Sequence, residues 1–153
     1  MKLWLAGLGL LALMGGAHLS DAFAQTDLNR IVTERRDGLK AVGVIFTAVG
    51  ETARAGTDPR ALAPRIAEVE AFFVGFENRF PTGTQQGAPG IDTRALPAIW
   101  TDRPGFERAL AALPARLVAL REAAASGNVA NFQAATQAAG AACGDCHRPY
   151  RAR

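Results

Sequence analysis

Apolar residues recur at intervals of three and four along four stretches of the chain, which is the spacing of one face of an α-helix. The stretches cover residues 27–50, 58–80, 104–126 and 129–150. The apolar positions are Leu28, Val32, Leu39, Val42, Phe46 and Val49; Leu62, Ile66, Val69, Phe73, Phe76 and Phe80; Phe106, Leu110, Leu113, Leu117, Leu120 and Ala124; Phe132, Ala135, Ala139, Cys143, Cys146 and Tyr150. No alternating strand pattern of useful length occurs, so we predict an all-α protein.

Proline, glycine and capping residues divide these stretches. Asp58 suits the N-cap of the second helix, and Pro64 predicts that the regular helix starts or kinks there. Pro114 predicts a bend in the third helix. Gly127 ends that helix, and Asn128 caps the fourth.

The connection between the second and third helices, residues 81–104, is long and rich in proline and glycine. Such loops in a compact domain are usually functional or pack over another part of the molecule. The other two connections are short. Four helices, each about 20 residues and about 30 Å long, joined in this way predict an antiparallel four-helix bundle.

The first 24 residues have the layout of a secretory signal peptide. Lys2 precedes a short apolar run, and Ala22-Phe23-Ala24 forms an A-x-A cleavage sequence. An uncleaved membrane anchor is the alternative, but it would need about 18 consecutive apolar residues. We therefore expect cleavage of residues 1–24, and one periplasmic domain, residues 25–153, without membrane contact.

Removal of the leader changes which potential metal ligands remain in the chain. The chain of 153 residues is 49% hydrophobic and 20% charged, which fits one globular domain and excludes a disordered chain. Both methionines and His18 lie in the leader, so residues 25–153 keep one histidine and both cysteines. The net charge of +3 comes mainly from arginines spread along the sequence, which argues against nucleic acid as a partner.

The remaining cysteines and histidine form one motif, Cys143-Gly144-Asp145-Cys146-His147. C-x-x-C-H is the attachment signal of c-type haem. Cysteines three residues apart share a helix face, so both thiols can add to the vinyl groups of one porphyrin while His147 ligates the iron. We therefore predict one covalent haem c, held through Cys143 and Cys146.

Three other interpretations of the motif are weaker. A structural zinc site needs four ligands of the Cys or His type, and residues 25–153 offer three. A thioredoxin-like C-x-x-C belongs near a βαβ pattern, which this sequence lacks. A plain disulfide would leave the adjacent His147 as a coincidence.

The second axial position of the iron has no obvious ligand. Electron-transfer cytochromes commonly use Met or a second His there, and residues 25–153 contain neither. The remaining candidate ligands are Lys40, Tyr150 and the terminal amine of Gln25. Lys40 lies about 100° round the helix from the apolar stripe, so we expect it to face solvent. Tyr150 is on the side of the haem attachment, and the terminal amine of Gln25 is prone to cyclise. We therefore predict a five-coordinate, high-spin haem with an open distal side.

Together, the leader, the four helices and the C-terminal C-x-x-C-H resemble cytochrome c′, the class II c-type cytochromes. The resemblance covers the whole mature chain. Its most specific stretches are residues 34–40, 80–81, 93–100 and 143–151.

The resemblance implies roles for five more residues. Leu39 matches the distal position over the open iron face, and Arg35 matches an arginine near a haem propionate. Arg36 falls where glutamine is frequent in the family, Arg94 matches a pocket-edge position, and Arg151 matches a basic residue beside the proximal imidazole. Each residue also has a purely structural interpretation. Leu39 can be a core leucine, and Arg35 can extend its charged end to solvent. Arg36 and Arg94 can be surface residues, and Arg151 can interact with the dipole at the C-terminus of the helix.

The apolar distal side determines the expected chemistry. Leu39 supplies no hydrogen bond, proton or base, and Val42 and Phe46 one turn away are also apolar, which is a poor site for peroxide cleavage. The resemblance implies reversible binding of NO or CO and a role in electron transfer. We expect a gas-binding haem protein that is not an enzyme. The alternative is a soluble periplasmic electron carrier, with a redox partner protein and incidental gas binding.

A second copy of the chain is the other expected partner. The first helix is apolar beyond one stripe, and Phe72 lies off the stripe of the second helix. The resemblance implies dimers formed through these two helices. We therefore expect a homodimer.

Overall fold

The computed structural model describes residues 16–153, with side chains from Gln25 onward. The elements are α1 (Gly16–Ala55), η1 (Arg60–Leu62), α2 (Ala63–Phe73), η2 (Phe76–Arg79), α3 (Ala98–Thr101), α4 (Arg103–Ala111), α5 (Leu113–Ser126) and α6 (Val129–Tyr150). The predicted leader lies outside the described residues, except that the backbone of residues 16–24 continues α1.

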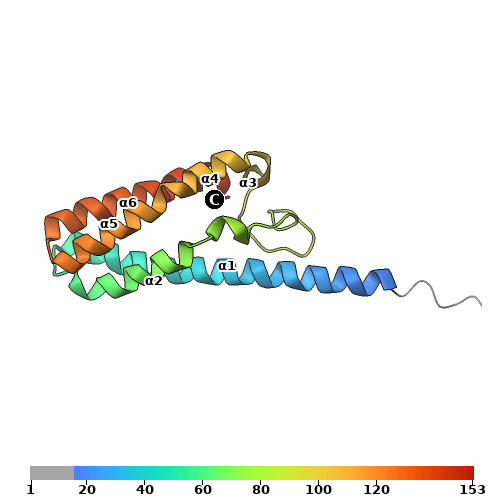
Figure 1. Cartoon of the computed structure of the whole chain (residues 1–153), viewed down its shortest axis with the longest axis horizontal. Helices are drawn as coiled ribbons and strands as arrows, with labels where there is room; N and C mark the ends of the chain where they lie inside the picture. Colours follow the sequence, from blue (N-terminus) through green and yellow to red (C-terminus); the bar gives the residue numbers. More distant parts are fainter. Residues whose placement is uncertain (1–15) are drawn as a thin grey trace, which may run out of the picture.

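Four helical rods form an antiparallel bundle, as predicted (Figure 1). α1 and α2 make one layer, and α6 with the α4–α5 rod makes the other. α5 packs along both α6 and α2, and α1 packs against α6. Although α1 has 40 residues, no helix within residues 16–153 is long and apolar enough to cross a membrane.

The second predicted helix is interrupted, so the expectation of one helix over residues 58–80 was wrong. α2 begins at Ala63 with Pro64 in its first turn, as the proline predicted. It ends at Phe73 because Gly75 takes a left-handed φ of 63°, and the short helix η2 follows. The apolar spacing continues through this break and therefore conceals it.

The third predicted helix is also divided, into α4 and α5, at Ala112. Pro114 lies in the first turn of α5, where its missing N–H is tolerated, so the predicted bend is a full break. Gly127 ends α5 with a φ of 72°, and Asn128 Oδ1 accepts a hydrogen bond from Asn131 N at 2.9 Å. Both end signals were predicted correctly.

The core has two parts. The aliphatic cluster joins α1, α2, α5 and α6 and consists of Ile45, Val49, Ala53, Leu62, Ile66, Val69, Leu113, Leu117, Leu120, Ala124, Phe132, Ala139 and Ala142. The aromatic cluster lies around η2, α3 and α4 and consists of Phe76, Phe80, Ala95, Ile99, Phe106 and Tyr150. Edge-to-face contacts with centroids 4.9–5.4 Å apart link its rings in a chain from Phe76 to Tyr150.

The long connection between η2 and α3 packs over the end of α6. Leu96 N donates to Tyr150 O at 3.1 Å, and Ala152 N donates to Arg94 O at 2.9 Å. Trp100 Nε1 donates to Phe80 O at 3.2 Å across the base of the loop. The connection is thus fixed to the C-terminal end of the helix that carries both cysteines.

Candidate functional site

The two cysteines lie where the two core clusters meet. Both are half-buried on α6; Cys143 packs against the aliphatic cluster and Cys146 against the aromatic cluster. The thiols are free and not joined in a disulfide. Burial raises the pKa of Cys143, and burial with the neighbouring Cys143 raises the pKa of Cys146 to about 11. Both thiols are therefore neutral at pH 7.

The imidazole of His147 lies at the surface of α6, directly after Cys146. Partial desolvation, and then the positive charge of Arg151, lower the pKa of His147 below its usual 6.5. The imidazole is thus mainly neutral at pH 7. The neutral ring is the form that ligates a metal.

The donor set fits haem c better than a zinc ion. No group of three or more His, Cys, Asp or Glu side chains in the described part of the chain is arranged to hold a metal ion. Two thiols one helical turn apart, partly buried against apolar side chains and followed by an imidazole, are the set that attaches haem.

Leu39 faces the same cluster as Cys146 from the opposite layer. Its half-buried side chain packs against the aromatic cluster, as does Cys146. At Gly38, a Cβ atom would overlap the ring of Phe72, so Phe72 packs directly on the α1 backbone. The Phe72 ring also lies 4.6 Å from the guanidinium carbon of Arg79. Phe72 therefore packs within the monomer, which removes it as an argument for a second buried face.

Arg35 is the most deeply buried charged residue of the site, with 2% of its surface exposed. Its two terminal nitrogens donate to Arg79 O at 2.8 Å, Thr93 Oγ1 at 2.9 Å, Thr84 O at 3.3 Å and Thr84 Oγ1 at 3.4 Å. The guanidinium carbon lies 4.3 Å from the centre of the Phe80 ring. Burial lowers the pKa of Arg35 to about 10. Neutral oxygens of η2 and the connection thus surround this cation. The hydrogen bonds tie both segments to α1.

The other arginines predicted for the site lie around the connection and the end of α6. Arg36 Nη1 donates to both the carboxylate and the carbonyl of Asp92, in the middle of the connection. Arg94 is exposed, and its carbonyl accepts the hydrogen bond from Ala152. Arg151 is exposed directly after α6. Arg94 and Arg151 thus lie at the end of α6 that carries His147, whereas Arg36 binds the connection from α1.

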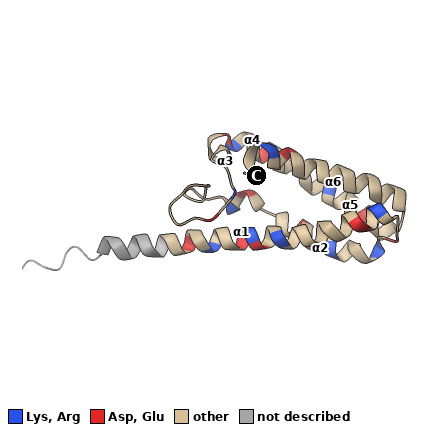
Figure 2. Cartoon of the chain, turned by 180° about the vertical axis from the view of Figure 1, so that it is seen from behind, with Lys and Arg blue, Asp and Glu red and all other residues tan. Residues whose placement is uncertain are grey.

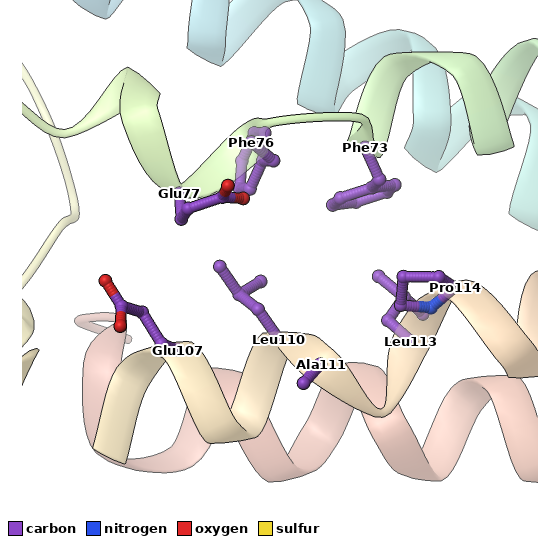
Figure 3. A pocket seen from close by; sticks show the side chains of 8 residues that line it. All are labelled: Phe73, Phe76, Glu77, Glu107, Leu110, Ala111, Leu113 and Pro114. Atoms are coloured by element: carbon purple, nitrogen blue, oxygen red, sulfur yellow. The ribbon is translucent and has the colours of Figure 1, made fainter. Parts of the chain in front are cut away.

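A cavity of about 340 Å³ lies between α2–η2 and α4–α5 (Figure 3). Its lining residues are Phe73, Phe76, Glu77, Glu107, Leu110, Ala111, Leu113 and Pro114. None of these was among the site residues predicted from the sequence. The cavity lies beside the helix breaks at Gly75 and Ala112. Gly75 and Pro114 were therefore the sequence features that could have indicated it.

The cavity joins the same two clusters as the thiols. Phe76 belongs to the aromatic cluster and Leu113 to the aliphatic cluster, while Phe73 packs against both. Arg103 joins two lining residues by donating to Glu107 Oε1 at 2.7 Å and to Glu77 O at 2.8 Å. The apolar wall therefore belongs to the same junction of the bundle as Cys143 and Cys146.

Comparison with known proteins supports the same assignment. The family model described as Cytochrome C′ matches residues 30–151. Cytochrome c′ of Rubrivivax gelatinosus is 32% identical over 98 residues, which cover 64% of this chain and 74% of that protein. Cytochrome c-554 of Cereibacter sphaeroides is 39% identical over 72 residues. That match covers 47% of this chain and spans about half of that relative, 46% of its length.

Solved structures share the bundle. The crystal structure of cytochrome c′ from Rubrivivax gelatinosus superposes with a TM-score of 0.72 at 27% identity, covering 82% of this chain and 97% of that chain. Cytochrome c′ from Thermochromatium tepidum has a TM-score of 0.74 at 24% identity with the same coverage, which shows the shared fold. By its family match and its fold, the chain belongs to the cytochrome c′ family, whose cofactor is haem c.

Proposed function

We propose that this chain is a periplasmic haem protein that binds NO or CO at an iron with one protein ligand. Cys143 and Cys146 attach the haem, and His147 is the axial ligand. The position of the thiols at the junction of the two clusters and the neutral imidazole support these roles. When bound, the haem iron supplies the coordination position at which a diatomic gas is ligated.

The packing of Leu39 carries this proposal. It reaches the cluster that holds Cys146 from the opposite layer, and its side chain has no atom that can ligate iron. Two of the three other candidate ligands are engaged elsewhere: Lys40 Nζ lies 2.8 Å from Asp37 Oδ1, and the Tyr150 hydroxyl donates to Asp102 Oδ2 at 2.8 Å. The distal side therefore stays open to a small neutral ligand.

The same apolar environment favours binding over catalysis. Leu39 offers neither a proton donor nor a base, and both are needed to cleave a peroxide bond. Phe73, Phe76 and Leu110 in the cavity extend the apolar surface available to the porphyrin. We therefore assign no enzymatic activity to the site.

The arginines supply positive charge around the haem. Arg35, Arg36 and Arg94 hold or flank the connection, and Arg151 lies beside the imidazole. Haem propionates are anionic, so a buried cation such as Arg35, with only neutral oxygens around it, suits a propionate nearby. These side chains form the cofactor-binding shell outside Cys143, Cys146 and His147.

Export and self-association complete the proposal. Residues 1–24 direct the chain to the periplasm and are then removed. The outer face of α1 supports a homodimer, because Val44 is 64% exposed and a Cβ atom at Gly43 would meet no neighbouring atom within 4 Å. A second α1 can therefore approach this surface closely.

Spectroscopy of the purified protein tests the proposal. The ferric form should give a high-spin absorption and EPR spectrum, and the ferrous form should bind CO with a clear spectral change. A six-coordinate, low-spin iron in both oxidation states would overturn it. Electron transfer is the second candidate function, and the charge around His147 favours it.

A further inference from the structure

Exposed arginines gather around His147 although they are far apart in the sequence. We call Arg94, Arg108, Arg151 and Arg153 the arginine surface; all four are exposed. Arg151 is close enough to His147 to lower its pKa, and the positive charge of Arg108 partly offsets the raised pKa of Tyr150. The antiparallel bridge between Ala95 and Arg151 brings Arg94 beside the last residues of the chain.

The side chains of the arginine surface do not pair with neighbouring protein carboxylates. Within residues 25–153, whose side chains are described, none of its four side chains forms an ion pair. The nearby carboxylates are engaged: Asp145 pairs with Arg148, and Asp102 accepts from Tyr150 and from Gly105 N. Figure 2 shows Lys and Arg positions on α4 close to the C-terminus. The arginines that appear spread along the sequence are thus concentrated by the fold.

We propose that the arginine surface docks an acidic redox partner protein over His147. This inference rests on the proposed function, in which His147 is the axial ligand. Complementary charge raises the rate of encounter and fixes orientation, so it directs an acidic partner to the one surface where the ligand imidazole is exposed. With haem bound, one electron would pass between its iron and the redox centre of the partner, so that one centre is oxidised and the other is reduced.

The composition of this surface favours a protein partner over an anionic membrane. Stable binding to a lipid surface usually needs apolar side chains that insert, in addition to basic residues. The large exposed apolar residues of the described chain are Val44, Val74 and Val118, on α1, after α2 and on α5. None of them belongs to the arginine surface.

A pair of charge-matched double variants tests the proposal in the haem-loaded protein. Arg108→Gln with Arg153→Gln removes two charges from the arginine surface. Arg54→Gln with Arg65→Gln removes two charges near the other end of the bundle, where Gln133 Nε2 donates to Ala53 O at 2.7 Å. The 14 positions between Gln133 and His147 span about 21 Å of helix. This is twice the screening length of about 10 Å at 0.1 M salt.

The measurement is the oxidation of each reduced protein by hexacyanoferrate(III) at 0.1 M salt, in which one electron leaves the protein and forms hexacyanoferrate(II). We expect Arg108→Gln with Arg153→Gln to lower the rate constant about threefold, and the control pair to change it little. The cationic tris(phenanthroline)cobalt(III) should show the opposite trend. Equal effects of both pairs would overturn the proposal.

Two controls separate this inference from the proposed function. Absorption spectra and CO titration of all variants should match the unmodified protein, since none of the four substituted arginines belongs to the haem site. A low-spin spectrum of the unmodified protein refutes the open iron site and leaves the docking surface standing. Binding to vesicles of phosphatidylcholine and phosphatidylglycerol that requires Arg108 and Arg153 would instead overturn the protein partner.

Discussion

Replacing Arg35 with methionine tests how the connection is held to α1. The guanidinium donates four hydrogen bonds, to Arg79 O, Thr93 Oγ1 and two oxygens of Thr84, at 2.8–3.4 Å. All four acceptors lie beyond η1 in the sequence, on η2 and the connection. Methionine has a comparable length and no donor, so the change removes these bonds and leaves most of the volume filled.

The magnitude follows from the burial of the cation. Burial lowers the pKa of Arg35 to about 10, and at about 1.4 kcal/mol per unit this shift corresponds to a desolvation cost of roughly 3 kcal/mol. Four bonds from a charged donor contribute about 1.5 kcal/mol each at the low end, and the contact with the Phe80 ring about 1 kcal/mol. The interactions therefore outweigh the desolvation cost. Allowing for apolar burial of methionine, we expect a loss of about 3 kcal/mol.

Chemical denaturation and amide hydrogen exchange of the haem-loaded protein check this expectation. Arg35→Met should lower the free energy of unfolding and speed exchange mainly in residues 81–97, because those backbone groups lose their anchor. Arg30→Met is the matched control, since Arg30 is 60% exposed and pairs only with carboxylates on α1. A loss of unfolding free energy below about 1 kcal/mol, with unchanged hydrogen exchange, would refute the role of Arg35 in holding the connection to α1.

Three further changes test other parts of the site. Leu39→Met should convert the iron to a low-spin, six-coordinate form and weaken CO binding, measured by absorption spectroscopy. Gly38→Ala should lower stability by about 1–3 kcal/mol in thermal denaturation because the new methyl group overlaps Phe72, whereas Gly140→Ala on α6, into open space, should be neutral or stabilising. Tyr150 has a raised pKa through burial and its carboxylate partner, so its stabilisation is complete below pH 10 and lost above it; Tyr150→Phe should flatten that alkaline loss in a pH series.

Local signals in the sequence determined the helices and the attachment motif. Asn128 caps α6 and Gly127 ends α5 because each acts within one turn of itself, so neighbouring residues suffice to predict them. The C-x-x-C-H motif is equally local, since its spacing alone places both thiols on one helix face. The break at Gly75 was missed because the apolar spacing of three and four continues from Phe73 to Phe76 and Phe80 across it.

Contacts between distant segments could not be predicted in the same way. The resemblance implied a haem propionate near Arg35, but no local pattern indicated which protein groups would bind its side chain. These groups are carbonyl and hydroxyl oxygens of residues more than 40 positions away. Whether a loop can curl over a helix and present those oxygens depends on the packing of Phe80 and Thr84, which no local pattern encodes.

The two helix breaks explain why the bundle keeps a cavity beside its two core clusters. Four uninterrupted helices of similar length would pack their apolar faces together along the whole axis. Here α2 stops at Gly75 and the α4–α5 rod breaks at Ala112, and a cavity of about 340 Å³ lies between them. Below the breaks the aliphatic cluster is tightly packed, whereas at the breaks aromatic rings line the wall. The glycine and the proline therefore mark where the cavity lies, although neither contributes a ligand.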